Sequence, residues 1–329
     1  MRVGIIGAGN IGSELFRRVK QLGWDVLFVL KSDGVYKNLT EKVDVENYQE
    51  HIYQKYIFTD ILDVVFLAIP TLDDGKAAFD YLSFYLSRNI PVITCEKGAL
   101  SNYFFELEKW LDNIGYSATV GGGTRLLRYA KEMISANTLE MHAVINGTLN
   151  YIFDEISRGR TLGEITSEAK RMGYAEPGTK DPLDIINQES VEDVPMKTAI
   201  LFNICNLSPE VIKGKEILAR KIQERDLIKL IRESGKRRFV VSITKKNRNQ
   251  NDSIGGFSYE VGEWIISGGF IDIAANPIFH ELVPHGVNNA IIICEGKYGV
   301  DGIYRLSGQG AGAGPTASSM IKDAFYLVK

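Results

Sequence analysis

Near its N-terminus the chain reads RVGIIGAGNIGSEL, residues 2–15. The apolar stretch from Arg2 to Gly7 predicts a short strand, and the residues after it repeat apolar side chains at helical spacing. Between strand and helix lies a GxGxxG turn, the context in which this motif indicates a dinucleotide site. Gly7 permits the tight turn, Gly9 lets the backbone approach a pyrophosphate, and Gly12 lets the helix pack closely on the strand. A purely structural glycine turn is the alternative.

The residues around this turn also indicate which dinucleotide is bound. We expect the phosphates to be held by N–H groups at the start of the helix, at Asn10 and Ile11. An acidic residue after the second predicted strand, Asp25 to Leu30, would bind the ribose 2′-hydroxyl of NAD. The chain has Lys31 at that position, and a lysine can pair with a 2′-phosphate. We therefore expect NADP, with NAD as the alternative and a solvated lysine as the competing interpretation of Lys31.

Strands and helices alternate through the first part of the chain. Further strands are expected over Val64–Ile69, Pro91–Cys95 and Ala118–Val120, with helices at about 74–88 and 102–114 between them. Alternation of this kind predicts an α/β fold with a doubly wound parallel sheet of Rossmann type.

The pattern changes after the three glycines at 121–123. Helical patterns follow near 125–135, 148–158, 162–172 and 196–206, with a strand at 139–145, and residues 237–306 alternate as in an antiparallel or mixed sheet. A glycine-rich turn then leads into a last helix that ends near Leu327. We expect a dinucleotide-binding domain of 1–123 plus 308–329, and an α+β substrate and dimerisation domain of 124–307 that carries a mixed sheet.

Composition excludes several classes of protein. The chain has 329 residues, with 38 Lys and Arg against 41 Asp and Glu, so its formal net charge is −3. A chain with this charge is not expected to have the basic surface that binds nucleic acid or an anionic membrane, so no partner of either kind is expected. Three cysteines without a CxxC pair and four scattered histidines suggest neither disulfides nor a metal site. With no apparent targeting segment and no apolar span, we expect a cytoplasmic protein.

A few ionisable residues stand out in this background. Lys97 lies in ITCEKGAL at the carboxyl end of a predicted strand, where doubly wound sheets bind ligands. Asp193 and Lys197 are four residues apart and share one face if the segment is helical. The alternatives without a function are a solvated loop lysine for Lys97 and a surface salt bridge for Asp193 and Lys197. Glu176, after a helix, and Asp184 complete the set of candidates.

Seven blocks of the sequence carry a resemblance to a known family. In chain order they are GIIGAGNIG (4–12), VITCEKGAL (92–100), ATVGGGT (118–124), NGTLNYI (146–152), AKRMGYAEP (169–177), NPIFHELVPHGVNNAIII (276–293) and GQGAGAGPTAS (308–318). With these blocks in family order, nearly the whole chain resembles homoserine dehydrogenase, and the CEKGAL form is similar to the archaeal branch. The resemblance implies an NAD(P)-dependent oxidoreductase of threonine, methionine and isoleucine biosynthesis, which interconverts L-homoserine and L-aspartate 4-semialdehyde.

The resemblance also implies roles for individual residues. Lys97 and Lys197 would face the carbonyl oxygen, with Lys197 as the acid/base, and Asp193 and Asp184 would hold and tune the two ammonium groups. Burial can lower the pKa of a lysine towards working pH, which suits this role. Glu176 would bind the substrate's ammonium group. The remaining implied contacts are Thr148, Gly147 and Tyr174 for the substrate, and Lys97, Pro70, Thr71, Gly310 and Gly312 for the cofactor. The resemblance further implies a homodimer and a bound monovalent cation, whose ligands cannot be assigned to residues of this sequence.

The stretch 177–193 departs from the family pattern. Extra residues precede Asp193, the glycine expected near Asn187 is missing, and Arg125 replaces a proline of the family. Two other functions therefore remain open: a related dehydrogenase of another small amino or oxo acid, and a non-catalytic NADP-binding sensor. The set of Lys97, Glu176, Asp193 and Lys197 argues against the sensor. The length leaves no room for a fused kinase, so a monofunctional enzyme is expected.

Overall fold

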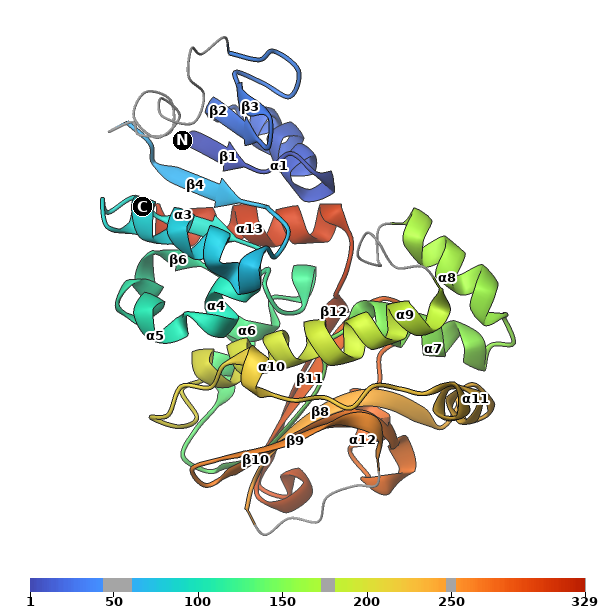
Figure 1. Cartoon of the computed structure of the whole chain (residues 1–329). Helices are drawn as coiled ribbons and strands as arrows, with labels where there is room; N and C mark the ends of the chain where they lie inside the picture. Colours follow the sequence, from blue (N-terminus) through green and yellow to red (C-terminus); the bar gives the residue numbers. More distant parts are fainter. Residues whose placement is uncertain (44–60, 173–180, 247–252, 329) are drawn as a thin grey trace. The chain divides into compact units, whose positions relative to one another are not determined.

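A computed structural model describes residues 1–43, 61–172, 181–246 and 253–328 of the chain. The chain divides into two compact units (Figure 1). Unit 1 is Met1–Thr119 together with Ala313–Lys329, and unit 2 is Val120–Gly312. These boundaries lie four to five residues from those expected at 123 and 308.

Unit 1 is built on a six-stranded sheet in the order β3-β2-β1-β4-β5-β6. Its strands are β1 (Arg2–Ile6), β2 (Asp25–Lys31), β3 (Gly34–Tyr36), β4 (Val64–Leu67), β5 (Val92–Thr94) and β6 (Ile114–Gly115). The strands are parallel except β3, which forms a hairpin with β2. The buried apolar runs of β1 and β4 suit a parallel sheet covered on both faces. The predicted doubly wound sheet is thereby confirmed.

Two details of unit 1 differ from prediction. The strand expected at Ala118–Val120 is wrong, because the chain turns there, with the Thr119 N–H donating to the carbonyl of Tyr116. The last strand is Ile114–Gly115 instead. The single helix expected at 102–114 is also wrong, since this stretch is broken into short helical pieces. The helices of unit 1 are α1 (Asn10–Gln21), η2 (Asp73–Gly75), α3 (Lys76–Leu86), α4 (Gly98–Asn102), α5 (Phe104–Leu107), η3 (Glu108–Asn113) and α13 (Ala313–Leu327).

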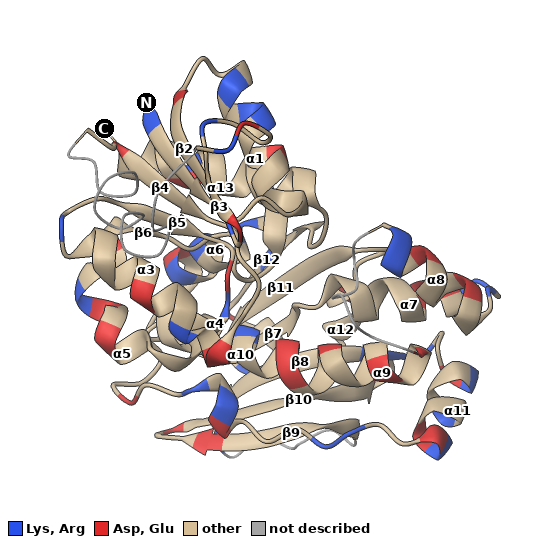
Figure 2. Cartoon of the chain, turned by 45° about the horizontal axis from the view of Figure 1, so that its top comes forward, with Lys and Arg blue, Asp and Glu red and all other residues tan. Residues whose placement is uncertain are grey.

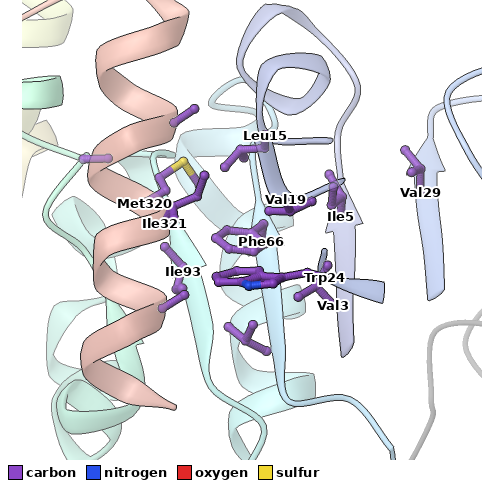
Figure 3. Close-up of a cluster of buried hydrophobic side chains, with 14 of the residues drawn as sticks. Val3, Ile5, Leu15, Val19, Trp24, Val29, Phe66, Ile93, Met320 and Ile321 are labelled. Atoms are coloured by element: carbon purple, nitrogen blue, oxygen red, sulfur yellow. The ribbon is translucent and has the colours of Figure 1, made fainter. Parts of the chain in front are cut away.

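The C-terminal helix α13 completes the core of unit 1 (Figure 3). Met320 and Ile321 of α13 point towards side chains from α1 and the sheet, including Leu15 and Phe66. Trp24 stacks on Phe66 with ring centroids 6.4 Å apart. The last residues of the chain thus pack on its first hundred, which explains why unit 1 is discontinuous in sequence.

Unit 2 contains a second six-stranded sheet, in the order β12-β11-β7-β8-β10-β9. Its strands are β7 (Thr138–Val144), β8 (Arg237–Lys245), β9 (Ser253–Val261), β10 (Trp264–Asp272), β11 (Asn288–Glu295) and β12 (Gly302–Gln309). Every pair is antiparallel, so the expectation of a mixed sheet is wrong in this respect. Local connection explains two of these pairs, because β9 and β10 form a tight hairpin and β11 and β12 are joined by a short turn, connections that only antiparallel strands allow.

Helices lie on both faces of this sheet, giving the predicted α+β arrangement. They are η4 (Gly122–Thr124), α6 (Leu126–Met133), α7 (Gly147–Ser157), α8 (Leu162–Arg171), α9 (Pro182–Asn187), a π-helix η5 (Gln188–Asp193), α10 (Val194–Ile204), η6 (Gly214–Glu216), α11 (Glu224–Arg232), η7 (Ile273–Ala275), α12 (Phe279–Leu282) and η8 (Lys297–Gly299). Phe153 of α7 packs on Phe270 of β10, with ring centroids 4.6 Å apart. On the other face, Phe279 of α12 meets His142 of β7 at 5.0 Å.

The charged residues are mixed in sign along the chain. Figure 2 shows acidic and basic segments side by side on α8 and on α11, in keeping with the small net charge. Within the described ranges, no helix combines the length and the apolar character needed to cross a bilayer.

Candidate active site

The three glycines of the turn at residues 7–12, called the glycine turn below, differ in what surrounds them. Gly7 has φ +93°, and a Cβ there would lie 2.2 Å from the carbonyl oxygen of Ala68. A Cβ on Gly12 would lie 1.9 Å from the carbonyl oxygen of Gly7. A Cβ on Gly9 would meet no heavy atom within 4 Å. The protein's own packing thus requires glycine at 7 and 12, whereas at Gly9 it leaves open space of the kind a close-fitting ligand needs.

The start of α1 has the other features that a phosphate needs. Gly9 is the N-cap residue and supplies no side-chain hydrogen bond to the first turn, which carries no acidic residue. Asn10 is exposed and Ile11 half-buried. Unpaired N–H groups at a helix start attract anions, helped by the helix dipole. The residues of the glycine turn therefore fit the pyrophosphate of a dinucleotide.

Lys31, at the end of β2, is held by its own hairpin. Its Nζ donates to the carbonyl of Leu39 and lies 4.0 Å from the centre of the Tyr36 ring. The Tyr36 hydroxyl in turn donates to Asp33 at 2.8 Å, which holds the pKa of Asp33 below its usual value. The ammonium group is therefore already positioned at the strand end, and a 2′-phosphate would add to these contacts or compete with them.

Lys97 follows β5 and is the N-cap residue of α4. It is half-buried. The neighbouring Glu96 is only 2% exposed and accepts a hydrogen bond of 2.6 Å from the hydroxyl of Thr71. Burial raises the pKa of Glu96, against the hydrogen bonds from Thr71, Ala99 and Gly98, which lower it. Thr71 is half-buried, and Pro70 before it is exposed.

Asp193 and Lys197 form an ion pair inside unit 2. Lys197 Nζ lies 2.6 Å from Asp193 Oδ2, and the two side chains are 14% and 6% exposed. The predicted i,i+4 geometry is present, and the low exposure excludes the alternative of a surface salt bridge. A buried pair of this kind is costly to break, because either partner alone is left charged and desolvated.

Two residues outside the predicted set complete this arrangement. Asn146 is the N-cap of α7, where its Oδ1 accepts from the Leu149 N–H at 2.7 Å. Its Nδ2 donates to Asp193 at 2.8 Å and to Glu189 at 2.5 Å. Glu189 is 4% exposed. We call Asn146, Glu189, Asp193 and Lys197 the acid–lysine cluster; it places two carboxylates and one ammonium around a single amide.

Glu189, Asp193 and Lys197 all lie on one long helix that contains a π turn. Helical structure runs unbroken from Pro182 to Ile204, with the π-helix η5 in the middle. In η5 the Val194 N–H donates to the carbonyl of Glu189, five residues back. Such π turns absorb an inserted residue without ending the helix. Pro195 follows the π turn directly, at the second position of α10 and inside the continuous helix.

Glu189 could have been found from spacing alone. Residues 189, 193 and 197 stand at i, i+4 and i+8, which places them on one helical face. Asn146 carries no comparable signal, because it lies 43 and 47 positions from its two acidic partners. Asp184 stands apart: it is exposed and forms a capping box with Asp181 at the start of α9. The expected Glu176 and Tyr174 lie outside the described residues.

The remaining predicted contacts lie in tightly packed parts of unit 2. A Cβ on Gly147 would lie 2.6 Å from the carbonyl oxygen of Val287, so packing alone demands glycine there. Thr148 is buried beside it. Gly310 donates to the same carbonyl at 3.0 Å and has no room for a Cβ next to Asn289. Gly312 has φ +107°. Their contacts with substrate or cofactor stay predictions.

Two further features concern metal binding and the backbone at Arg125. Across residues 1–43, 61–172, 181–246 and 253–328, no three His, Cys, Asp or Glu side chains are grouped to hold a metal ion. The expected monovalent cation has no assigned ligands. Arg125, which replaces the family's proline, has φ +57°, a backbone conformation that proline's ring forbids.

Family models and curated proteins with similar sequences match both units of the chain. The family model of homoserine dehydrogenase matches residues 126–325, and that of ketopantoate reductase (PanE/ApbA) matches residues 3–123. The homoserine dehydrogenase of Helicobacter pylori is 24% identical, with 100% of this chain and 74% of the relative covered. That of Bacillus subtilis is 25% identical, with 100% and 73% covered.

Solved structures give the same picture of the fold. A homoserine dehydrogenase from Thermoplasma acidophilum is similar with a TM-score of 0.72 and 17% identity, covering 99% of this chain and 98% of that one. A hyperthermophilic archaeal homoserine dehydrogenase in complex with NADPH is similar with a TM-score of 0.66 and 20% identity, covering 98% and 96%.

Proposed function

Because this chain belongs to the homoserine dehydrogenase family, as the seven sequence blocks predicted, we propose an assignment of its residues to that family's reaction. The enzyme is an oxidoreductase that interconverts L-homoserine and L-aspartate 4-semialdehyde with NAD(P)(H). The observation that carries the assignment is the acid–lysine cluster of unit 2, a buried ammonium group paired with a carboxylate that a buried amide holds in turn. The roles below are our proposals for the individual side chains.

Lys197 is the acid/base. A bound nicotinamide supplies or accepts the hydride at the substrate carbon, and negative charge develops on the oxygen in the reducing direction. An ammonium group placed at that oxygen stabilises the charge and donates the proton that makes the alcohol. Asp193, 2.6 Å from Lys197 Nζ, orients the ammonium group. Asn146 in turn fixes the Asp193 carboxylate at 2.8 Å.

Lys97 is the second cation at the same oxygen. It belongs to unit 1 while Lys197 belongs to unit 2, so this joint role rests on the family resemblance. The position of Lys97 after β5, at the carboxyl end of a doubly wound sheet, supports a place beside the cofactor. A point charge on a flexible stem suits a role in which the ammonium follows the reacting oxygen.

Recognition of the substrate falls to the residues implied by the family motifs. Glu176 binds the substrate ammonium group, and Tyr174, Thr148 and Gly147 provide polar contacts. Asp184, exposed at the start of α9, belongs to the same substrate segment. The buried carboxylate of Glu189 joins this set, because it shares the Asn146 amide with Asp193 and a cationic group of the substrate would be attracted to the two carboxylates.

The cofactor site is the glycine turn, with NADP as its nucleotide. Gly7 and Gly12 shape the turn, Gly9 leaves room for the pyrophosphate, and the helix start at Asn10 and Ile11 holds the phosphates. Lys31 pairs with the 2′-phosphate. The NADPH complex of the archaeal neighbour supports this assignment. Further contacts are proposed for Lys97, Pro70, Thr71, Gly310 and Gly312.

Two wider properties follow the family pattern. We propose a cytoplasmic homodimer that associates through the sheet of unit 2. The exposed edge strand β12, on which every second side chain is open to solvent, supports an association through that sheet. Equilibrium sedimentation of the purified chain tests the oligomeric state, and a monomer at micromolar concentration would contradict it.

One assay tests the assignment as a whole. NADPH oxidation is followed with L-aspartate 4-semialdehyde beside a panel of other small oxo acids. We expect turnover with the semialdehyde to exceed turnover with every other member. Faster turnover of another oxo acid would favour a related dehydrogenase, for which the departures at 177–193 are the reason. NADPH binding without turnover of any substrate would favour a sensor.

A further inference from the structure

Glu96 is a buried carboxylate that the proposed reaction leaves without a role. Its Oε1 accepts from the Thr71 hydroxyl at 2.6 Å and from the Gly98 N–H at 2.5 Å. Its Oε2 accepts from the Ala99 N–H at 2.9 Å. One side chain therefore joins the loop after β4 to the start of α4. Three hydrogen bonds to an ionised acceptor are among the stronger contacts that a side chain makes.

The same two segments meet at two further points. Asn102 Nδ2 donates to the carbonyl of Asp74 at 2.9 Å. Gly75 lies so close to Gly98 that a Cβ on Gly75 would be 2.0 Å from the Gly98 carbonyl carbon. We call residues 71–75 and 96–102 the β4–β5 loop contact. Its first segment contains Asp73 and Asp74 with φ +47° and +53°, conformations that cost energy and persist only where the surroundings enforce them.

The backbone on each side of Lys97 is hydrogen-bonded, and the bond on its C-terminal side belongs to this contact. The Glu96 N–H before it donates to the Thr94 hydroxyl at 2.9 Å. The Gly98 N–H after it donates to the Glu96 carboxylate. The Lys97 carbonyl also accepts from the Ser101 N–H at 2.9 Å, so the peptide between Lys97 and Gly98 is held at both its oxygen and its nitrogen. This restricts ψ of Lys97 and with it the direction in which its side chain leaves the backbone.

We propose that Glu96 is a positioning residue, which aims Lys97 at the reacting carbonyl and ties it to the cofactor-side loop at Thr71. The proposal rests on the role of Lys97 in the proposed function. An error of about 1 Å in the position of a catalytic group can cost about a hundredfold in rate. A carboxylate that only capped α4 would stabilise unit 1 without this effect on turnover.

The variant Glu96→Gln tests the proposal. An amide keeps the shape but has one oxygen, so it cannot accept from Thr71, Gly98 and Ala99 together. We expect kcat to fall on the order of tenfold or more, while the Kd for NADPH changes little. The matched control is Asp323→Asn, because Asp323 is also a buried carboxylate of unit 1, bound by the N–H and hydroxyl of Ser117 at 2.8 and 2.7 Å. Equal loss of stability and equal kcat in both variants would overturn the proposal.

The pH profile gives a second, independent readout. Burial raises the pKa of Glu96, and Lys97 is the charged group that acts on it in the opposite direction. Protonation turns one acceptor oxygen into a donor, so the loop contact loosens as pH falls through this raised pKa. Wild-type kcat should therefore fall on the acid side, and Glu96→Gln should lack that part of the profile. An unchanged acid limb in the variant would contradict the proposal.

A double variant separates this proposal from the role of Lys97. If Glu96 acts through Lys97, Glu96→Gln added to Lys97→Ala should cost no further activity, since the group to be positioned is gone. A further loss equal to that of Glu96→Gln alone would overturn the positioning role. Near-normal kcat of Lys97→Ala itself would overturn the proposed function instead. If Glu96→Gln fails to fold, Thr71→Val removes one donor only, and a several-fold lower kcat is expected.

Discussion

The glycine turn of unit 1 offers backbone N–H groups at an exposed helix start, whereas the acid–lysine cluster of unit 2 holds two carboxylates and an ammonium group away from water. The first relies on the space left at Gly9 and on dipoles that every helix has. The second relies on particular charged side chains that contact one another away from water. Substitutions should therefore act by sterics in the turn and by uncompensated charge in the cluster.

Lys197→Ala should give the largest effect. Loss of a general acid costs on the order of 10²- to 10⁴-fold in kcat, while the Kd for NADPH should stay near the wild-type value. Because the substitution leaves Asp193 buried without its cation, Lys197→Met combined with Asp193→Asn controls for stability. The matched surface control is Lys76→Ala, which breaks the exposed i,i+4 pair with Asp80. Rescue of Lys197→Ala by added methylammonium would show that the ammonium itself is missing; near-normal turnover would remove Lys197 from the mechanism.

Substitutions in the glycine turn should affect either NADPH binding or stability, depending on the position. Gly9→Val meets open space in the protein, so the melting temperature should hardly change while the Kd for NADPH rises about tenfold or more. Gly12→Ala places its Cβ 1.9 Å from the carbonyl oxygen of Gly7, so overpacking should lower the free energy of unfolding by about 1–3 kcal/mol. Thermal unfolding and NADPH fluorescence titration measure both. A stable Gly9→Val that binds NADPH normally would show that the ligand does not approach this residue.

Glu189→Gln should give an intermediate effect. The amide keeps a hydrogen-bond acceptor for Asn146 but removes one of the two buried negative charges. Stability should be unchanged or slightly higher, because a buried charge is replaced by a neutral group. We expect kcat/KM for homoserine to fall about tenfold, since one of the carboxylates proposed to attract the substrate ammonium is lost. Chemical denaturation and steady-state kinetics test this, and a large loss of stability would assign Glu189 to the fold instead.

The two sites also differ in how far sequence alone could describe them. The glycine turn is local: six consecutive residues in a strand–helix context specify both backbone path and ligand class. In the cluster, spacing indicated the pair of Asp193 and Lys197, but burial and the bond to Asn146 depend on contacts between α7 and the helix at 182–204. Periodicity reports one helix face and says nothing of what packs on it. The π-helix is likewise set by tertiary packing, whereas the spacing of Glu189 from Asp193 and Lys197 was available from the sequence.

The preference between NADPH and NADH should show the smallest effect. It tests the exposed cofactor site of unit 1. Lys31 is shared between the Leu39 carbonyl, the Tyr36 ring and a proposed 2′-phosphate, so its gain from the phosphate is that of a partly solvated pair. Such pairs contribute about 0.2–1 kcal/mol, which corresponds to a preference of a few-fold. Lys31→Asp should lower kcat/KM for NADPH and raise it for NADH, because a carboxylate repels the phosphate and accepts from the ribose hydroxyl. Tyr36→Leu is the control that removes the ring without changing charge. Equal efficiency of the two nucleotides in the wild type would take Lys31 out of cofactor selection and leave it as a hairpin contact.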